Sequence, residues 1–326
     1  MSKLRVLSLF SGIGAYEKAL TNTGIDYELV NYCEVDKVKS RAYSILHSVS
    51  EDKNLWDVTN ININNINDFD LLVYSPPCQS FSIAGKKRGL NDIRGTLFYN
   101  ALQVIHLKKP KYCIMENVDN LANKFKPEFD EMLKSLEQEG YKNYWKIINA
   151  KDFIPQNRNR VFVVSIRKDI NVNDFEFPIG KDNRNWWDVI DAKEHRQLTG
   201  RQQRMVDYVK GINIEDEIKI EGIPQFDNAV ITLRQSGLRF QNNREYPTIT
   251  AHYGKGGGNF TIMAKNGIYG GITPRQCFKL MGFDYEDSDL LTKNGFSVSS
   301  QYVMAGDSVV VTVLEGIFKN LFINNK

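Results

Sequence analysis

The sequence predicts an α/β protein with a Rossmann-like, doubly wound sheet and a second, smaller, loop-rich domain. Over roughly the first 170 residues, short apolar runs alternate with segments of helical periodicity, the pattern of strands joined by crossover helices. A glycine-containing turn follows directly after the first apolar run, as in dinucleotide-binding sheets. Beyond about residue 180 the periodicity weakens while Gly, Asn, Arg and Gln become more frequent, which indicates a separate domain.

Each expected strand is a short apolar run bounded by polar or turn residues. These runs cover residues 4–10, 27–36, 70–75, 111–118, 144–153 and 160–167. Each expected helix has apolar residues at helical spacing, and Gly24, Pro110 and Gly140 mark three of the ends. The helices are expected within residues 11–24, 37–48, 94–109 and 127–140. The asparagine-rich residues 61–68 are expected to form an exposed loop.

The C-terminal part of the chain shows a second group of helical signals. Thr273 can cap a helix in which Pro274 takes the first position and Gln276 completes a capping box. Residues 308–322 are apolar enough for a buried helix, which we expect to pack back on the first domain. The predicted catalytic, cofactor-binding domain comprises residues 1–180 and 301–326. The predicted smaller recognition domain comprises residues 181–300.

Composition is that of an ordinary globular protein. The 326 residues suffice for one large domain or two unequal ones, and 42% of them are hydrophobic and 25% charged. No apolar run reaches the length of about 18 residues that predicts a membrane-spanning helix. The N-terminal segment lacks the pattern of a signal peptide, so we expect a cytoplasmic protein.

Charge by itself does not identify a partner. The net charge of +3, from 42 basic and 39 acidic residues, is too small to indicate nucleic-acid binding. Residues 231–265, however, carry five basic residues against Glu245 alone, a local charge of +4, together with five glycines. Such a segment suits a phosphate backbone. An ordinary solvated loop explains the same composition equally well.

The cysteines indicate neither a zinc site nor disulfides. No C-x-x-C pair occurs, the four histidines are scattered, and a cytoplasmic location disfavours disulfides, so we expect no metal site. Cys33, Cys113 and Cys277 lie in apolar runs and are expected in the core. Cys78 differs, because two prolines precede it in SPPCQSFSIAG (75–85) and small or polar residues follow it. The prolines predict a rigid turn that presents the thiol at the start of a mobile loop.

The ends of the first strands indicate an adenosine-containing cofactor. Gly12 and Gly14 allow a tight turn and a close approach of the backbone to a ligand at a helix N-terminus. Glu34 ends the next strand 20 residues after Gly14, where a Rossmann-like site places an acid on the ribose. Asp57 follows and is expected to bind an adenine amino group. Because Glu17 stands where the NAD fingerprint has its third glycine, a different adenosine cofactor is favoured.

Three further groups follow the expected strands and could form a catalytic set. They are Cys78, Glu116 in MENV, and the pair Arg158 and Arg160 in PQNRNR. Each has an ordinary structural explanation when taken alone: a buried thiol, a capping acid or a solvated surface pair. Together, at the carboxyl ends of strands in one sheet, they indicate a nucleophile, an acid and positive charge in one crevice.

Six segments resemble the motifs of DNA cytosine-5 methyltransferases of the bacterial restriction–modification type. LFSGIGAYEKAL resembles the S-adenosylmethionine motif, and PPCQSFSIAGKKRGLNDIRGTLF resembles the nucleophile motif with its mobile catalytic loop. Four other motifs follow in the family's order: MENV, IPQNRNRVFVV, TPRQCFKLMGF and AGDSVVVTVLEGI. The resemblance covers nearly the whole chain except about residues 180–270.

Two positions depart from the family pattern. Asp307 stands where the final motif usually has Asn, and an ionised Asp accepts hydrogen bonds but cannot donate them. This difference concerns a corner of the cofactor site and not the chemistry. Pro76 stands where several members carry Phe, which is a known kind of variation in the family.

The resemblance implies an S-adenosylmethionine-dependent methyltransferase whose nucleophile is Cys78. The Cys78 thiolate is expected to add to C6 of cytosine and so activate C5 for methylation. Glu116 is expected to bind or protonate N3, Arg160 to reach O2, and Arg158 to support the cysteine and the acid. The residues implied to bind the cofactor are Phe10, Gly12, Gly14, Glu34, Asp57, Pro77, Asp307 and Ser308.

The resemblance also implies double-stranded DNA as the substrate, because a stacked cytosine must flip out before a thiol can reach C6. The loop after Cys78 and the divergent segment 180–270 are expected to contact the DNA, the latter with Arg and Gln side chains suited to base edges. The expected contacts are Gln79, Ser82, Lys86, Arg94, Arg234 and Arg239, with Gln235 and Gln241 also suited to bases. A cognate restriction endonuclease and a monomeric state are expected.

Three alternatives remain open from the sequence. A tRNA cytosine-5 methyltransferase would use the same core, although a basic recognition segment of about 90 residues favours DNA. A non-catalytic DNA-binding member of the family would not need Cys78, Glu116 and the two arginines, which are all present. An NAD-dependent enzyme is disfavoured by the missing third glycine and by the cysteine turn.

Overall fold

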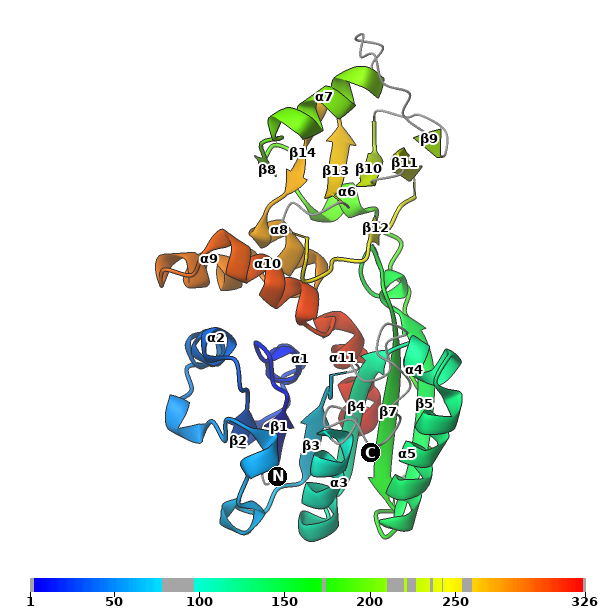
Figure 1. Cartoon of the computed structure of the whole chain (residues 1–326). Coiled ribbons are helices and arrows are strands. Elements are labelled where there is room, and N and C mark those ends of the chain that lie inside the picture. The colour runs from blue at the N-terminus through cyan, green and yellow to red at the C-terminus, as the bar shows by residue number, and fades with distance from the viewer. Residues whose placement is uncertain are drawn as a thin grey trace. The chain divides into compact units, whose positions relative to one another are not determined.

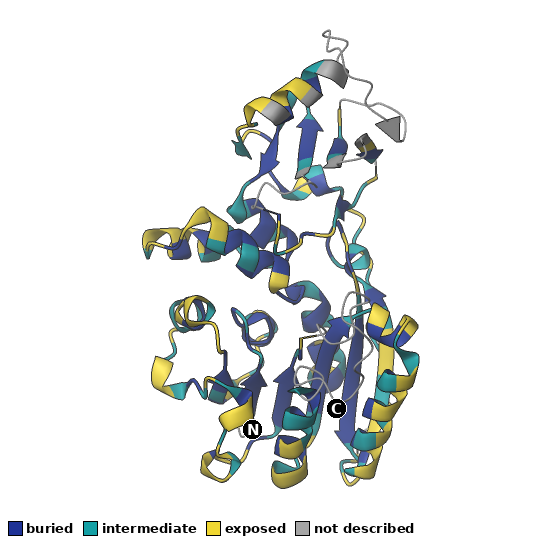
Figure 2. Cartoon of the chain, in the orientation of Figure 1, coloured by how far each residue is buried: buried dark blue, intermediate teal, exposed yellow. Residues whose placement is uncertain are grey.

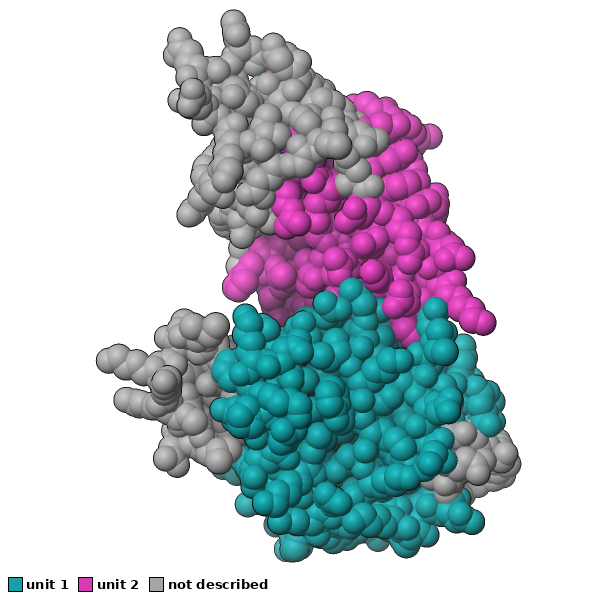
Figure 3. Space-filling model, turned by 90° about the vertical axis from the view of Figure 1, so that its right-hand side faces the viewer, with its two compact units in different colours: residues 1–150, 159–180, 309–326 teal, residues 151–158, 181–308 magenta. Residues whose placement is uncertain are grey.

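The computed structural model of the chain describes residues 3–77, 97–171, 174–209, 220–221, 227–234, 237–241, 243–253 and 260–324. The chain divides into two compact units, coloured separately in Figure 3. The first unit comprises residues 1–150, 159–180 and 309–326, and the second comprises residues 151–158 and 181–308. The expected division into a catalytic and a recognition domain remains a prediction about function. Among the described helices, none combines the length and apolarity needed to cross a membrane.

The described strands of the first unit form a six-stranded mixed sheet, in the order β2-β1-β3-β4-β7-β5 (Figure 1). The first four are mutually parallel, whereas β7 runs antiparallel to both β4 and β5. The bounds are β1 Leu4–Leu9, β2 Tyr27–Cys33, β3 Leu71–Tyr74, β4 Tyr112–Val118, β5 Tyr141–Asn149 and β7 Asn159–Arg167. This arrangement confirms the predicted α/β class.

The register of the parallel strands brings their carboxyl ends to one edge of the sheet. Leu9 at the end of β1 is paired with Cys33 of β2 and with Tyr74 of β3, and Tyr74 is paired with Met115 of β4. The chain runs from β1 outward to β2 and then returns to β3 on the other side of β1. The order of strands therefore reverses between β1 and β3, which is where ligands bind in open α/β sheets.

Helices cover both faces of this sheet. One face shares an apolar core with α3 (Leu97–Lys108) and α5 (Lys126–Gln138), to which Phe98 and Phe129 contribute fully buried rings. Burial of each such ring stabilises the fold by about 1.5–3 kcal/mol. Figure 2 shows the central strands β1, β3, β4 and β7 largely buried, the edge strand β5 partly exposed, and the outward sides of α3 and α5 exposed. The other α-helices in the described part of this unit are α1 Ala15–Asn22, α2 Lys37–His47, α4 Asn120–Asn123 and α11 Val311–Phe318, and a π-helical segment, Lys319–Ile323, follows α11.

Helix α11 packs against α1, so the predicted return of the C-terminal helix to the first unit is confirmed. Its apolar residues Val311, Leu314 and Phe318 are fully buried, and Asn22 of α1 donates a hydrogen bond to Glu315 (2.7 Å). Glu315 lies 293 positions after Asn22 in the sequence. Helix α11 thus packs beside α1, although the two helices lie near opposite ends of the chain.

Two predicted elements differ in detail. The strand expected at residues 144–153 begins earlier, at Tyr141, and ends at Asn149, because residues Ala150–Asp152 form a 3-10 turn. The expected exposed loop at residues 61–68 contains a 3-10 turn, Ile63–Asn65, and buries Ile66 at 2% exposure. Two further 3-10 turns, Glu51–Lys53 and Val58–Asn60, precede it. Because asparagines dominate this segment, its sequence did not indicate that Ile66 would be buried.

The second unit contains a six-stranded sheet that the weak periodicity did not predict. The described strands lie in the order β8-β14-β13-β10-β11-β9, and apart from the parallel pair β11 and β9 the neighbours are antiparallel. Its core includes Val206, Ile231, Phe240 and Ile262. The bounds are β8 His195–Arg196, β9 Ile220–Glu221, β10 Ala229–Arg234, β11 Gly237–Gln241, β13 Phe260–Lys265 and β14 Ile268–Ile272.

Helices and a small ladder complete the second unit. The helix predicted after Thr273 is confirmed as α8, and its capping box is present: the Gln276 backbone N–H donates to Thr273 Oγ1 (3.3 Å) and the Thr273 N–H donates to Gln276 Oε1 (2.8 Å). Strands β6 (Gln156–Asn157) and β12 (Tyr246–Pro247) pair in parallel. Its described α-helices are α6 Trp186–Val189, α7 Gly200–Val209, α8 Pro274–Leu280, α9 Tyr285–Lys293 and α10 Val298–Asp307.

Three cysteines lie in the core, as predicted. Cys33, Cys113 and Cys277 are free thiols with 2% exposure or less. Burial raises the pKa of Cys33 to about 12 and also raises the pKa values of Cys113 and Cys277 above the usual range. These thiols are therefore inert near neutral pH. Cys78 lies outside the described residues.

Gly306 in α10 provides a test of the packing within the second unit. A Cβ atom at this position would lie 2.1 Å from the carbonyl carbon of Thr250 and 2.2 Å from the nitrogen of Ala251. We expect Gly306→Ala to lower the free energy of unfolding by about 1–3 kcal/mol in urea titrations, because neither backbone group can yield without distortion.

Gly200→Ala in α7 is the matched control, since a Cβ atom there meets no atom within 4 Å. Alanine has the higher helix propensity at both positions. The control should therefore be neutral or slightly stabilising. Equal stability of the two variants would contradict the packing assigned to Gly306.

Candidate active site

The turn after β1 is held by hydrogen bonds from the neighbouring strand and helix. Phe10, Gly12 and Gly14 all have left-handed φ values, of 56°, 57° and 80°. Gly14 is the N-cap of α1, and the His47 ring occupies the place of a Cβ atom there, with Nε2 only 2.0 Å from the ideal position. That ring nitrogen hydrogen-bonds the Ile13 carbonyl oxygen (2.9 Å). A side chain at position 14 would therefore displace His47, whereas a Cβ at Gly12 would meet no atom within 4 Å.

Glu34 lies beside this turn, as the spacing predicted. Its Oε2 accepts the backbone N–H of Gly12 (2.8 Å), and its Oε1 accepts the N–H of Asp36 (2.8 Å). Glu34 as a whole is 9% exposed, and burial raises the pKa of its carboxyl from the ordinary value against the opposing effect of these two N–H groups and of Lys39. A carboxylate has further acceptor positions. Glu34 can therefore bind a hydroxyl-bearing ligand at the glycine turn.

Asn54 is a structural member of this site that the sequence did not reveal. Its Oδ1 accepts the N–H groups of Glu34 (3.1 Å) and Trp56 (2.8 Å). Its Nδ2 donates to the Glu34 carbonyl oxygen (2.9 Å) and to Ser40 Oγ (2.8 Å). One buried amide thus joins the end of β2 to the segment that carries Asp57. No local pattern marks an asparagine whose partners lie 14 and 20 residues away.

Asp57 is the N-cap of the 3-10 turn Val58–Asn60. Its Oδ1 accepts the backbone N–H of Thr59 (2.9 Å) and the Thr59 hydroxyl (2.8 Å).

Two large apolar side chains next to the site acids are exposed, Val35 at 67% and Trp56 at 39%, and Trp56 has a left-handed φ of 61°. Such backbone strain in a non-glycine residue costs about 1–3 kcal/mol and is concentrated at functional sites. Sequence reasoning missed both apolar side chains.

The turn that leads to Cys78 follows β3 and is held from β4. Asn117 Nδ2 donates to the Pro76 carbonyl oxygen (3.0 Å), while Asn117 Oδ1 accepts the Val118 N–H (2.8 Å). Pro76 is buried and Pro77 is exposed. The asparagine of MENV therefore positions the proline turn, a contact that sequence reasoning did not anticipate. The predicted loop contacts Gln79, Ser82, Lys86 and Arg94 lie, like Cys78, outside the described residues.

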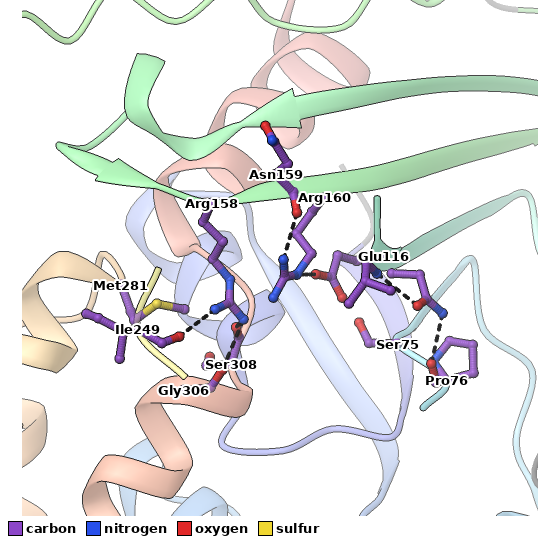
Figure 4. Close-up of polar contacts among 12 residues, drawn as sticks. Ser75, Pro76, Glu116, Arg158, Asn159, Arg160, Ile249, Met281, Gly306 and Ser308 are labelled. Carbon is purple, nitrogen blue, oxygen red and sulfur yellow. Dashed lines mark hydrogen bonds and ion pairs between the residues drawn. The ribbon is translucent and has the colours of Figure 1, made fainter. Parts of the chain in front are cut away.

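Glu116 and Arg160 form an ion pair across β4 and β7. Arg160 Nε lies 3.1 Å from Glu116 Oε1, and the side chains are only 18% and 10% exposed, respectively (Figure 4). Antiparallel pairing sets Val118 opposite Arg160 and Glu116 opposite Phe162, so the two charged residues are diagonal neighbours on one face. The structure thus brings together the predicted acid and one of the two predicted arginines.

Arg158 donates hydrogen bonds to carbonyl groups of the second unit. Its guanidinium donates to the carbonyl oxygens of Ile249 (2.8 Å), Gly306 (3.0 Å) and Ser308 (2.9 Å), and the residue is 3% exposed (Figure 4). It therefore ties the final motif, where Asp307 is exposed and Ser308 is buried, to the segment after β12. Its expected role beside Cys78 remains a prediction.

The expected recognition residues are described only in part. Arg239 is exposed on β11, opposite Thr232 of β10. Gln241 Oε1 accepts a hydrogen bond from the Thr232 hydroxyl (3.4 Å). The backbone of Arg234 ends β10, but its side chain and all of Gln235 lie outside the described structure. DNA contact by these residues remains a prediction.

Comparison with known proteins identifies the family of the chain. A family model described as C-5 cytosine-specific DNA methylase matches residues 4–323. The chain belongs to this family. It is therefore a methyltransferase of the C5-cytosine type, and the resemblance drawn from its motifs is confirmed.

Full-length relatives support the assignment. The type II methyltransferase M.HhaI of Haemophilus parahaemolyticus is 32% identical over 332 positions, covering 98% of this methyltransferase and 95% of the relative. The orphan methyltransferase M.SPRI of Bacillus phage SPR is 30% identical over 439 positions, covering 98% of both chains. The crystal structure of the S. pombe Dnmt2 methyltransferase matches with a TM-score of 0.70 over 99% of both chains, and at 18% identity it supports the fold alone.

Substitution of Arg158 tests the hydrogen bonds that it donates to three backbone carbonyl groups in this methyltransferase. We expect Arg158→Lys to lower the free energy of unfolding by about 2–4 kcal/mol, because one ammonium cannot match the planar geometry that reaches three buried carbonyl groups. Urea unfolding of the purified protein measures the loss. Arg204→Lys, at an exposed position on α7, is the control and should leave stability unchanged. Wild-type stability of Arg158→Lys would refute the structural role.

Proposed function

We propose that the protein transfers a methyl group from S-adenosylmethionine to C5 of a cytosine flipped out of double-stranded DNA, within a specific sequence. The observation that carries this proposal is the shielded Glu116–Arg160 pair at the sheet edge where the Pro76–Pro77 turn leads into Cys78. The likeness to type II methyltransferases supports a biological role in protecting DNA from a restriction endonuclease.

The proposed reaction begins with the Cys78 thiolate, which forms a bond from Sγ to C6 of the base. The electron pair of the C5–C6 double bond moves toward C5 and N3, and Glu116 binds or protonates N3 to stabilise it. C5 is then nucleophilic and, with S-adenosylmethionine bound, would attack the sulfonium methyl carbon; the bond from that carbon to sulfur breaks, S-adenosylhomocysteine is left, and any proton taken up at N3 returns to Glu116. Removal of the C5 proton by a base restores the double bond and expels the Cys78 thiolate.

Arg160 and Glu116 act as a unit in this proposal. The ion pair fixes the carboxyl in a largely water-excluded place, where hydrogen bonds to the base are stronger than in water. Arg160 would also donate to O2 of the flipped cytosine. Asn117 holds the backbone before Cys78, so the nucleophile and the acid are positioned by adjacent residues of β4.

The residues around the glycine turn fit S-adenosylmethionine. The space beside Gly12 admits a ligand next to the Glu34 carboxyl, which would bind the ribose hydroxyls. Val35 and Trp56 expose apolar surface suited to the adenine ring, with Asp57 for its amino group. When bound, this cofactor supplies the methyl group in electrophilic form. Phe10, Gly14, Pro77, Asp307 and Ser308 remain predicted contacts.

The substrate class is proposed from the family and the recognition segment. The family description names DNA, and the described hairpin of β10 and β11 exposes Arg239 in the divergent region. An arginine on such a hairpin can contact base edges or phosphates. The alternative, tRNA, would use the same catalytic set. A direct comparison of the two substrates therefore tests the proposal.

We expect purified protein to transfer labelled methyl groups from S-adenosylmethionine to double-stranded DNA and not to tRNA. Cys78→Ser should abolish transfer and retain cofactor binding, because only the nucleophile is lost. DNA carrying 5-fluorocytosine at the modified position should give an adduct with the wild-type protein that survives denaturing electrophoresis. Transfer to tRNA alone would replace the substrate, and a wild-type rate in Cys78→Ser would refute the mechanism.

Cofactor affinity should depend on pH through Glu34. Since burial raises the pKa of Glu34, protonation begins at a higher pH than for an exposed glutamate. The ionised form accepts hydrogen bonds, so affinity should be full above that pKa and should fall as the pH decreases through it. Calorimetric titration from neutral to mildly acidic pH measures this. Glu34→Gln should bind more weakly and lose most of the pH dependence, and an unchanged pH profile would contradict the assignment.

A further inference from the structure

Tyr16 connects the two turns that follow β1 and β3. It lies in the first turn of α1, two residues after Gly14, and is 3% exposed. Its hydroxyl lies 3.0 Å from Ser75 Oγ and 3.4 Å from the carbonyl oxygen of Tyr74. Tyr74 is the last residue of β3, and Ser75 begins the segment that leads into Cys78. The contact therefore spans the point where the order of strands reverses.

The Tyr16 contact is buried and polar, so its geometry is strongly constrained. Burial, followed by the nearby charge of Glu116, raises the pKa of Tyr16 well above its ordinary value, which keeps the hydroxyl protonated and able to donate. A buried hydroxyl that loses its partner costs about 1–3 kcal/mol. The Tyr16 ring is packed in the layer formed by α1, so the hydroxyl cannot follow a displaced Ser75 without moving the helix.

The same segment is held from its other side by β4. Asn117 Nδ2 donates to the Pro76 carbonyl oxygen (3.0 Å), one residue after Ser75. The Asn117 contact aligns the turn with Glu116, its neighbour in sequence. The Tyr16 contact aligns the turn with α1, and therefore with the glycine turn from which α1 begins. Two polar contacts from two different elements thus fix consecutive residues before the nucleophile.

The proposed chemistry explains why these two turns need a mutual register. The thiol bonds to C6 of the base and the methyl group goes to C5, which are adjacent atoms of one ring. The nucleophile depends on the turn after β3, whereas the cofactor would be held at the turn after β1. A displacement of about 1 Å between reacting groups can reduce a rate by about 100-fold. A direct contact between the two turns removes this freedom.

We propose that Tyr16 is a positioning residue whose hydroxyl, bonded to Ser75 and to the Tyr74 carbonyl, holds the nucleophile turn in register with the cofactor turn. The proposal rests on the proposed function for its effect on catalysis. Its structural part, the position of the turn before Cys78, does not depend on which nucleic acid is methylated.

The test compares Tyr16→Phe, Ser75→Ala and the double variant with the wild-type protein in single-turnover methyl transfer. We expect each single variant to transfer about 10-fold to 100-fold more slowly, with unchanged affinity for S-adenosylmethionine. The double variant should be no slower than the worse single variant, because both remove the same contact. Additive losses, or a loss explained by weaker cofactor binding, would overturn the proposal.

Tyr27→Phe is the matched control. Its hydroxyl also contacts α1, at the Glu17 carbonyl oxygen (3.4 Å) and Thr21 Oγ1 (3.5 Å), but it does not belong to the nucleophile turn. This variant should transfer at the wild-type rate. An equal loss in Tyr27→Phe would show that Tyr16 only stabilises the helix.

A second measurement needs no nucleic acid. Cys33, Cys113 and Cys277 are buried, so alkylation of the native protein by iodoacetamide, mapped by mass spectrometry, reports on Cys78. Tyr16→Phe and Ser75→Ala should change the alkylation rate of Cys78 severalfold, and Tyr27→Phe should not. If the wild-type protein methylates no nucleic acid while this pattern holds, the proposed function fails and the positioning role stands. Equal alkylation rates in all four proteins would overturn the role.

Discussion

Parallel pairing of β1 with β3, and of β3 with β4, is the constraint on which the whole site depends. Because Leu9, Tyr74 and Met115 are joined by this register, the glycine turn, the proline turn and Glu116 all follow at the same edge of the sheet. A slip of one residue in any of these strands would turn its next side chain to the opposite face. The three groups would then no longer converge, whatever their identity.

The edge is polar but largely buried, so its groups need hydrogen-bond partners close at hand. Glu34 accepts two backbone N–H groups, Asn54 uses both ends of its amide, and Asn117 holds a proline carbonyl. Each contact satisfies a buried polar group and also orients a neighbour that is expected to meet a ligand. Stability and positioning therefore come from the same bonds.

Arg158 and Arg160 are two positions apart in the sequence, but their side chains contact different partners. Arg160 lies within β7, where the pleat directs it to the face that holds Glu116. Arg158 precedes that strand and donates to three backbone carbonyl groups in the second unit. The two arginines of this motif therefore have different structural positions. Arg160 faces Glu116, whereas Arg158 joins segments that are distant in the sequence. Charge alone would not distinguish them.

The sequence by itself determined the order of strands and helices in the first unit, the capped helix at Thr273, the buried thiols and the glycine turn with Glu34, because each depends on neighbours within a few residues or on a fixed offset. It also determined the family, through ordered motifs. Only the tertiary structure decided the sheet of the second unit and the contacts of Asn54, Asn117 and Tyr16. The partners that give them these contacts between elements lie 14 to 59 residues away, and a hydrogen bond over such a separation leaves no periodic trace in the chain.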